Sequence, residues 1–130
     1  MQDREQIEEL ARRYTEAWCS HDPARVAAEY RPGGTIAVND GESAGIAEVA
    51  DGFITAFPDI EVFMDDVVMR DDGVVAYRWT FTGTSAETGR WVRIPGFEEW
   101  TIGADGLIAE SRGHFDQAEY DRQLRDGAER

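Results

Sequence analysis

Four ionisable side chains near the end of the chain alternate with uncharged ones. They are Glu110, Arg112, His114 and Asp116. In a β-strand successive side chains point to opposite faces, so the spacing predicts that these four share one face. Carboxylate, imidazole and guanidinium groups together could move a proton and stabilise a negative oxygen. Because a strand normally buries apolar side chains, this charged face either is solvated or lines a pocket.

Other kinds of catalytic or metal site find little support in the residues. The only two histidines, His21 and His114, are far apart in sequence, and Cys19 is the single cysteine. All thirteen basic residues are arginine, which excludes Schiff-base chemistry, including the attachment of pyridoxal phosphate. No Gly-x-Ser-x-Gly elbow occurs, and Ser111 is expected on the strand face opposite His114. We therefore expect neither a metal nor another cofactor.

Length and composition predict one folded domain spanning residues 1–130. The formal charge of -14 is spread along the chain and would repel phosphate backbones, so nucleic acid is not an expected partner. No apolar run approaches the roughly 18 residues of a membrane span. The N-terminal residues are charged where a signal peptide would be apolar. We expect a cytoplasmic protein that does not bind membranes.

Helical patterns dominate the first half of the chain. Apolar residues at helical spacing predict an amphipathic helix over residues 2–20. An aspartate–proline pair predicts a short second helix over 22–30. A brief strand is expected over 35–38, followed by a turn and a third helix over 46–57 that ends before a proline.

Strand patterns dominate the second half. The predicted strands are 60–69, 74–83, 90–102 and 110–116. The third is expected to bulge at Pro95 and Gly96, and a short helix over 117–125 follows the last. Helices segregated from an antiparallel meander indicate an α+β domain.

Three segments carry a resemblance to a known family. They are Phe57-Pro58-Asp59-Ile60, the run from Val74 to Thr84, and Asp105 to Glu110 before an aromatic–aspartate pair and Gln123-Leu124. Together with the element order, they resemble the SnoaL-like polyketide cyclases of the NTF2-like superfamily over essentially the whole chain. The resemblance implies a cone: a curved antiparallel sheet wrapped around three N-terminal helices, with a short C-terminal helix. It also implies a ligand cavity at the open end and commonly a homodimer through the sheet.

SnoaL-like cyclases close a ring by intramolecular aldol addition, without metal or cofactor, on hydrophobic carbonyl-bearing molecules such as polyketide intermediates. An aspartate late in their last strand is the general acid/base, and by motif position Asp116 resembles it. The related limonene epoxide hydrolases have a Trp-Arg-Asp-Tyr-Phe-Asp motif at the position of residues 111–116. This chain has Gly113 where that motif has its middle acid. That departure argues against epoxide hydrolysis.

Ketosteroid isomerases are also similar in outline. Tyr14 lies where their pocket tyrosine would be sought, and Glu98 falls near their oxyanion-binding acid. Strand alternation predicts that Glu98 points inward, provided that the register does not slip by one residue. The position of their catalytic base is matched by Val38, with Asp40 as the alternative in another register. Without that base the isomerase mechanism lacks a proton carrier.

The predicted catalytic set is Asp116 with His114 as its partner, and Arg112 with Glu98 as a polar anchor. Each has a structural alternative. Asp116 also begins an Asp-x-x-Glu motif that could cap the last helix. His114 could be a hydrogen-bonded core or rim residue, and Arg112 could only neutralise Glu110 or Glu98. Two alternative functions stay open: a non-catalytic module that binds a small molecule or dimerises, and an epoxide hydrolase or ketosteroid-isomerase-like enzyme that uses the same residues.

Several aromatic side chains could provide an apolar lining for a hydrophobic small molecule. The predicted substrate-binding residues are Tyr14, Trp18, Phe53, Phe57, Tyr77, Trp79 and Trp100, together with Glu110. Most of the aromatic ones are expected to be core, with two or three reaching the cavity.

Overall fold

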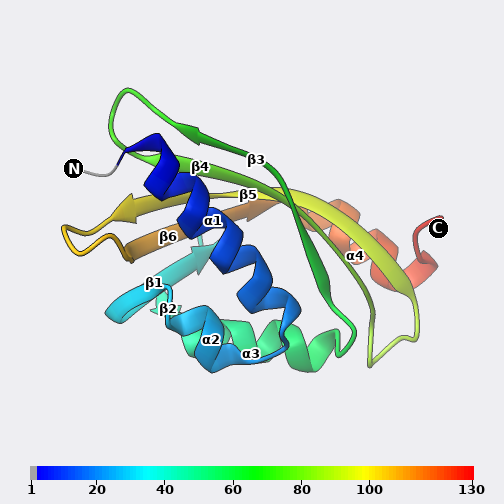
Figure 1. Ribbon diagram of the computed structural model, residues 1–130. Coiled ribbons are helices and arrows are strands. Elements are labelled where there is room, and N and C mark those ends of the chain that lie inside the picture. Colours follow the sequence, from blue (N-terminus) through cyan, green and yellow to red (C-terminus); the bar gives the residue numbers. More distant parts are fainter. Residues whose placement is uncertain (1–2) are drawn as a thin grey trace.

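The computed structural model describes residues 3–130 and has the predicted α+β architecture. The helices are α1 (Arg4–Cys19), α2 (Pro23–Ala27), α3 (Ile46–Ala56) and α4 (Gln117–Asp126). The strands are β1 (Tyr30–Val38), β2 (Ala44–Gly45), β3 (Glu61–Met69), β4 (Val75–Thr84), β5 (Trp91–Ile102) and β6 (Ile108–Phe115). Figure 1 shows a strongly curved sheet with α1, α2 and α3 against one side of it and α4 at the far end.

The N-terminal helices begin at capping residues. Asp3 accepts a hydrogen bond from the Gln6 backbone N–H, and the Gln6 side chain accepts one from the Asp3 N–H, forming a capping box. Asp22 caps α2, in which Pro23 takes the first position. The prediction that α2 continues toward Tyr30 was wrong, since Tyr30 is buried and pairs with Ile108 as the first residue of β1.

The sheet has the strand order β2-β1-β6-β5-β4-β3. Strands β3 to β6 pair antiparallel in sequence order, as predicted. The sheet is not wholly antiparallel, however, because β1 runs parallel to β6. This pairing begins with Tyr30, crosses a register shift and continues to Val38 opposite Gly113. It brings the N-terminal third of the chain beside the strand that ends the sheet.

The expected bulge at Pro95 and Gly96 is absent. Both residues stay in continuous register, with Thr80 and Trp79 of β4 respectively. A Cβ atom at Gly96 would lie 2.5 Å from the Trp79 ring and from the His114 carbonyl oxygen. The glycine therefore permits a close approach of the Trp79 side chain rather than a bulge.

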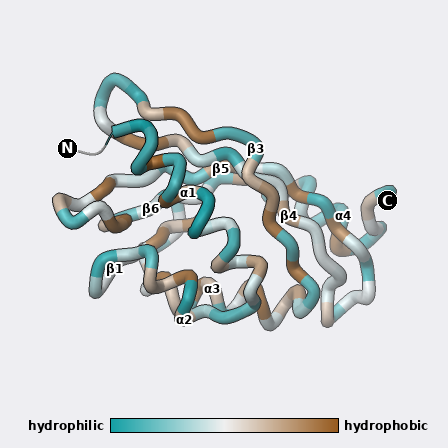
Figure 2. The backbone as a smooth tube through the Cα atoms, viewed as in Figure 1, coloured by the Kyte–Doolittle hydropathy of each residue, from teal (hydrophilic) through white to brown (hydrophobic). Residues whose placement is uncertain are grey.

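The core lies between the concave face of the sheet and the helices. Helix α1 buries one face, which carries Ile7, Leu10, Ala11, Tyr14, Ala17 and Trp18. Figure 2 shows hydrophobic and hydrophilic residues interspersed along helices and strands, as elements with one buried face require. No helix within residues 3–130 is long and apolar enough to cross a membrane.

Candidate active site

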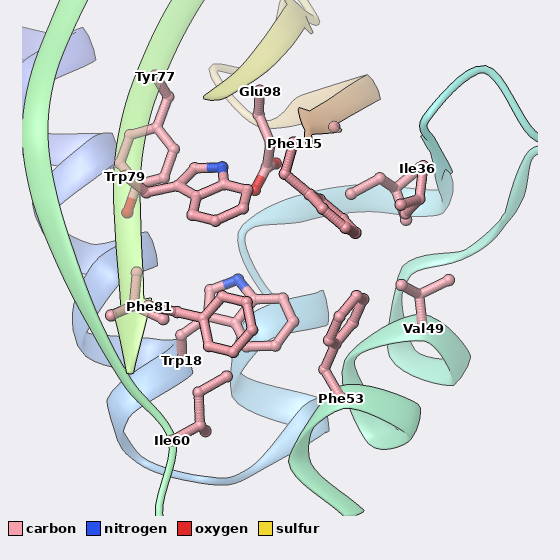
Figure 3. A pocket seen from close by; sticks show the side chains of 13 residues that line it. Trp18, Ile36, Val49, Phe53, Ile60, Tyr77, Trp79, Phe81, Glu98 and Phe115 are labelled. Atoms are coloured by element: carbon pink, nitrogen blue, oxygen red, sulfur yellow. The ribbon is translucent and has the colours of Figure 1, made fainter. Parts of the chain in front are cut away.

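A cavity of about 60 Å3 lies between the concave face of the sheet and helices α1 and α3, and it is partly open to solvent. Figure 3 shows the aromatic rings that surround it. Its apolar and aromatic lining residues are Trp18, Ile36, Val38, Val49, Phe53, Ile60, Val62, Tyr77, Trp79, Phe81, Gly113 and Phe115. The one acid that lines it is Glu98 of β5, so the structure places a carboxyl group in a largely apolar enclosure.

Glu98 is only 5% exposed and accepts hydrogen bonds from four side chains. Its Oε1 atom lies 2.7 Å from Ser111 Oγ, 3.0 Å from Trp100 Nε1, 3.0 Å from the Tyr14 hydroxyl and 3.4 Å from the Tyr30 hydroxyl. These donors come from α1, β1, β5 and β6, so the whole fold is needed to assemble the cluster. The prediction that Glu98 points inward is confirmed.

The two carboxyl oxygens of Glu98 differ in their hydrogen bonding. Oε1 accepts from all four donors, whereas Oε2 shares only the Tyr14 hydroxyl, at 3.2 Å. A carboxylate oxygen can accept about two hydrogen bonds, so Oε1 is saturated and Oε2 retains acceptor capacity. Oε2 is therefore the oxygen that can still accept a further hydrogen bond or a proton.

Burial raises the pKa of Glu98, because removal from water disfavours the charged carboxylate; hydrogen bonds from Trp100, Ser111, Tyr14 and Tyr30 oppose that shift. Burial, together with the nearby charge of Glu98, also raises the pKa values of Tyr14 and Tyr30 well above their usual range. Both tyrosines thus remain protonated donors. A carboxyl pKa displaced upward suits a group that must both accept and return a proton.

The raised pKa of Glu98 predicts how the unfolding free energy depends on pH. Its native pKa lies above the ordinary value of 4.5, so the folded state binds the proton more tightly than the unfolded state. The resulting stabilisation is fully present below pH 4.5 and is lost as the pH rises through the native pKa. We expect the unfolding free energy of the wild type, measured relative to Glu98→Gln by urea titration, to fall over that range. A difference that rises with pH would contradict the shift.

The charged stripe of β6 lies on the outer face of the sheet, away from this cavity. Glu110, Arg112 and Asp116 are exposed, and the Arg112 side chain retains 65% of its accessible area. His114 is half-buried, at 2.8 Å from Glu99, and its ring stacks on Phe97. Of the two alternatives for the stripe, the resemblance to the SnoaL-like cyclases favoured a pocket. That expectation is wrong for this cavity, because the apolar walls face inward and the alternate residues of β6 take that side.

Asp116 occupies the helix-capping position. Its carboxylate accepts a hydrogen bond from the Glu119 N–H at 3.0 Å at the start of α4. Arg112 Nε lies 3.9 Å from Glu110 Oε1, and the hydrogen bonds of Glu98 within residues 3–130 come from other side chains. The structure thus separates the four residues of the predicted catalytic set: Glu98 lines the cavity, while His114, Arg112 and Asp116 lie outside it.

Four predicted substrate-binding aromatic residues line the cavity: Trp18, Phe53, Tyr77 and Trp79. The other three are fully buried core residues, and two of these, Tyr14 and Trp100, donate to Glu98. Phe57 packs against Phe81 and Tyr120. Glu110, the remaining predicted binding residue, lies on the outer face.

The sequence reasoning missed the inward residues of β6 and the role of Tyr30. Ser111 donates to Glu98, and Gly113 and Phe115 line the cavity. The alternation that grouped the charged residues also grouped these three on the opposite face, so the signal was present. Tyr30 had no such signal, because it was assigned to a helix end. Among residues 3–130, no cluster of histidine, cysteine or acidic side chains could hold a metal ion.

Comparisons with solved structures agree on the fold. TsrD from Streptomyces laurentii is 22% identical, with a TM-score of 0.81 over 95% of this chain and 98% of that one. A candidate SnoaL-like polyketide cyclase from Jannaschia sp. CCS1 is also 22% identical, with a TM-score of 0.77 over 99% of this chain and 100% of the other. SalBIII, an epoxide hydrolase/cyclase-like enzyme with a role in pyran ring formation in the polyether salinomycin, is 18% identical, with a TM-score of 0.79 and coverage of 92% and 97%.

No curated protein matches the chain in sequence. These structural likenesses, all below 25% identity, establish the shared fold. The model of the SnoaL-like domain matches residues 11–111, which contain Tyr14, Tyr30, Glu98, Trp100 and Ser111. The chain therefore belongs to the family of SnoaL-like domains.

Proposed function

We propose that the protein is a cofactor-independent enzyme that performs acid/base chemistry on a hydrophobic, carbonyl-bearing small molecule. The reaction would be an aldol-type cyclisation or a related isomerisation, as in a polyketide intermediate. The observation that carries the proposal is the Glu98 carboxyl group, buried in an apolar cavity with Oε1 saturated and Oε2 available. In this proposal Glu98 replaces Asp116 as the acid/base, and Asp116 remains a helix cap.

The mechanism begins with the ionised carboxylate. Glu98 Oε2 removes a proton from a carbon beside a carbonyl group, and the electron pair of the C–H bond moves toward the carbonyl oxygen. Tyr14, Tyr30, Trp100 and Ser111 hold the carboxyl group in place, so little reorganisation is needed. The proton is then returned to carbon, giving isomerisation, or to the oxygen formed by ring closure.

The size of the cavity limits what can enter it. An engineered apolar cavity of about 150 Å3 admits benzene, whereas this one measures about 60 Å3. Only the reacting part of a larger substrate would fit, with the remainder extending through the open side. A flat polycyclic molecule would have to displace the aromatic walls.

The direct test of activity is hydrogen exchange on a simple probe. The ethyl ester of α-methylacetoacetic acid has one acidic hydrogen between two carbonyl groups, and its loss in D2O is followed by NMR. We expect the protein to accelerate that loss at catalytic concentration above the rate in buffer at the same pH. No acceleration of this probe, or of cyclic ketones, would favour the non-catalytic binding module.

Gly113 offers a way to fill the cavity while leaving the Glu98 residue unchanged. A Cβ atom there would lie 3.7 Å from Ile36 Cδ1 and 3.8 Å from Glu98 Cγ, which are ordinary contacts. We therefore expect Gly113→Ala to fold normally and to retain most of its activity. Gly113→Val should also fold, but its exchange rate should fall about tenfold or more because its methyl groups occupy the cavity. Wild-type activity in Gly113→Val would place the reaction elsewhere.

Pairing with a second copy of the chain stays a prediction. The outer face of the sheet exposes three large apolar side chains, Phe63, Val68 and Phe97. A second copy would remove them from water on association. Sedimentation of the wild type and of Phe97→Asp would check whether this face mediates the pairing.

A further inference from the structure

The indole nitrogen of Trp79 is a buried donor without a partner. Among residues 3–130, Trp79 Nε1 is the only buried side-chain nitrogen or oxygen that makes no hydrogen bond. Nearby polar groups are satisfied: Tyr77 bonds Thr15, and Ser111 bonds Glu98. An indole N–H can only donate, and burying it unpaired costs free energy. The structure therefore holds a donor that would gain from an acceptor on a ligand.

Packing, rather than a hydrogen bond of its own, holds the Trp79 ring in place. The ring crosses Gly96 of the neighbouring strand, where a side chain would collide with it. Its centroid lies 6.0 Å from that of Phe81 and 6.3 Å from that of Phe115. A donor fixed in this way is already ordered, but Nε1 itself is buried, so a ligand oxygen reaches it when neighbouring side chains move aside.

Trp79 and Glu98 line the same cavity and are complementary in their hydrogen bonding. Glu98 Oε2 can accept a proton, and Trp79 Nε1 can donate a hydrogen bond. No lysine, arginine or histidine is among the lining residues, and a carboxylate repels anions. These features favour an uncharged ligand that combines a hydrogen-bond acceptor with an acidic C–H group.

We infer that Trp79 Nε1 binds the carbonyl oxygen of the substrate, and that the substrates are small uncharged ketones or β-keto esters whose acidic carbon faces Glu98. This assignment rests on the proposed acid/base function. When Glu98 removes the α-proton, the C–H electron pair forms the enolate double bond and the carbonyl π pair moves onto oxygen. The N–H of Trp79 stabilises that oxygen while Glu98 Oε2 carries the proton.

Binding can be tested without turnover. The protein, labelled with 15N, is titrated with cyclopentanone and separately with methylenecyclopentane, which has the same shape but no carbonyl oxygen. The indole N–H signal of Trp79 is assigned by its absence from Trp79→Phe. We expect the ketone to shift this signal and the hydrocarbon to leave it close to its free position. Equal shifts with both ligands, or none with the ketone, would overturn the assignment.

Turnover provides a second test. Trp79→Phe keeps an aromatic ring over Gly96 but removes the donor, so we expect kcat for exchange of the α-methylacetoacetate ester to fall about a hundredfold, with a smaller change in KM. The matched control is Trp91→Phe, since Trp91 lies outside the cavity and contacts Arg93 and Arg130. Its kcat is expected to equal that of the wild type. A Trp79→Phe variant with wild-type kcat would refute the role in catalysis.

The two proposals fail in different ways. Exchange that depends on Glu98 but leaves the Trp79 signal insensitive to ketone would retain the acid/base function and reject the carbonyl anchor. A ketone-specific shift of Trp79 in a protein that exchanges no protons would retain the anchor as a binding site and reject the enzyme.

Discussion

The Glu98→Gln variant is expected to exchange the α-proton of the α-methylacetoacetate ester about 10²- to 10⁴-fold more slowly than the wild type. Glutamine has the shape of glutamate but cannot take up the proton. Its amide oxygen can accept from Ser111, Trp100 and the tyrosines in the place of Oε1, and its NH2 group then occupies the place of Oε2. The fold should therefore survive, and the loss should appear in kcat.

The adjacent acid is the matched control for this experiment. Glu99 lies on the opposite face of β5, where it bonds His114 and Arg70. Glu99→Gln removes the same charge from the same strand without touching the cavity, so we expect its exchange rate to stay within about twofold of the wild type. Equal rates in Glu98→Gln and the wild type would show that Glu98 carries no proton. A loss confined to Glu99→Gln would instead direct attention to the outer face and to His114.

The largest loss of stability is expected for Trp100→Ala, at about 3–5 kcal/mol. Trp100 is fully buried, stacks on Tyr77 at 4.8 Å between ring centroids and meets Tyr14 edge-on at 5.2 Å. Truncation leaves a large cavity and also removes one of the donors to Glu98. The measurement is the free energy of unfolding in urea, followed by far-UV circular dichroism because the variant alters tryptophan fluorescence.

Trp91→Ala is the comparison for that variant. Trp91 is half-buried at the start of β5 and lies beneath the guanidinium groups of Arg93 and Arg130. Its truncation should cost about 1 kcal/mol, since solvent can fill the space and cation–π contacts at exposed sites are weak. Equal losses of unfolding free energy in the two variants would show that the buried Trp100 side chain stabilises the fold no more than the half-buried Trp91 does.

Most of the fold followed from local patterns in the sequence. The periods of α1 and α3, the Asp22-Pro23 cap and the strand alternation were sufficient to predict the α+β class. The errors lay where a long-range contact overrode a local preference. Tyr30 joins β1 because it pairs with Ile108, and Gly96 accommodates Trp79 rather than a bulge.

Prediction of the site was less complete. Alternation in β6 correctly separated the charged residues from Ser111, Gly113 and Phe115, but it could not identify which face is concave. The motif position of the family favoured Asp116 as the general acid/base, whereas in the structure that residue caps α4. In β5 the alternation of Glu98 with Glu99 was sufficient to place Glu98 on the face of Trp100, and that face is the inner one.

The sequence by itself determined most of the secondary elements and predicted the inward direction of Glu98 in β5, because these depend on composition and on neighbours close along the chain. Tertiary structure alone decided how that acid is surrounded. Tyr14, Tyr30 and Ser111 reach Glu98 from 84, 68 and 13 positions away in the chain. Sheet curvature and the parallel pairing of β1 with β6 bring them together, and neither is encoded in any one segment. The charged stripe of β6 faces outward for the same reason, because the fold turns its apolar neighbours toward the cavity.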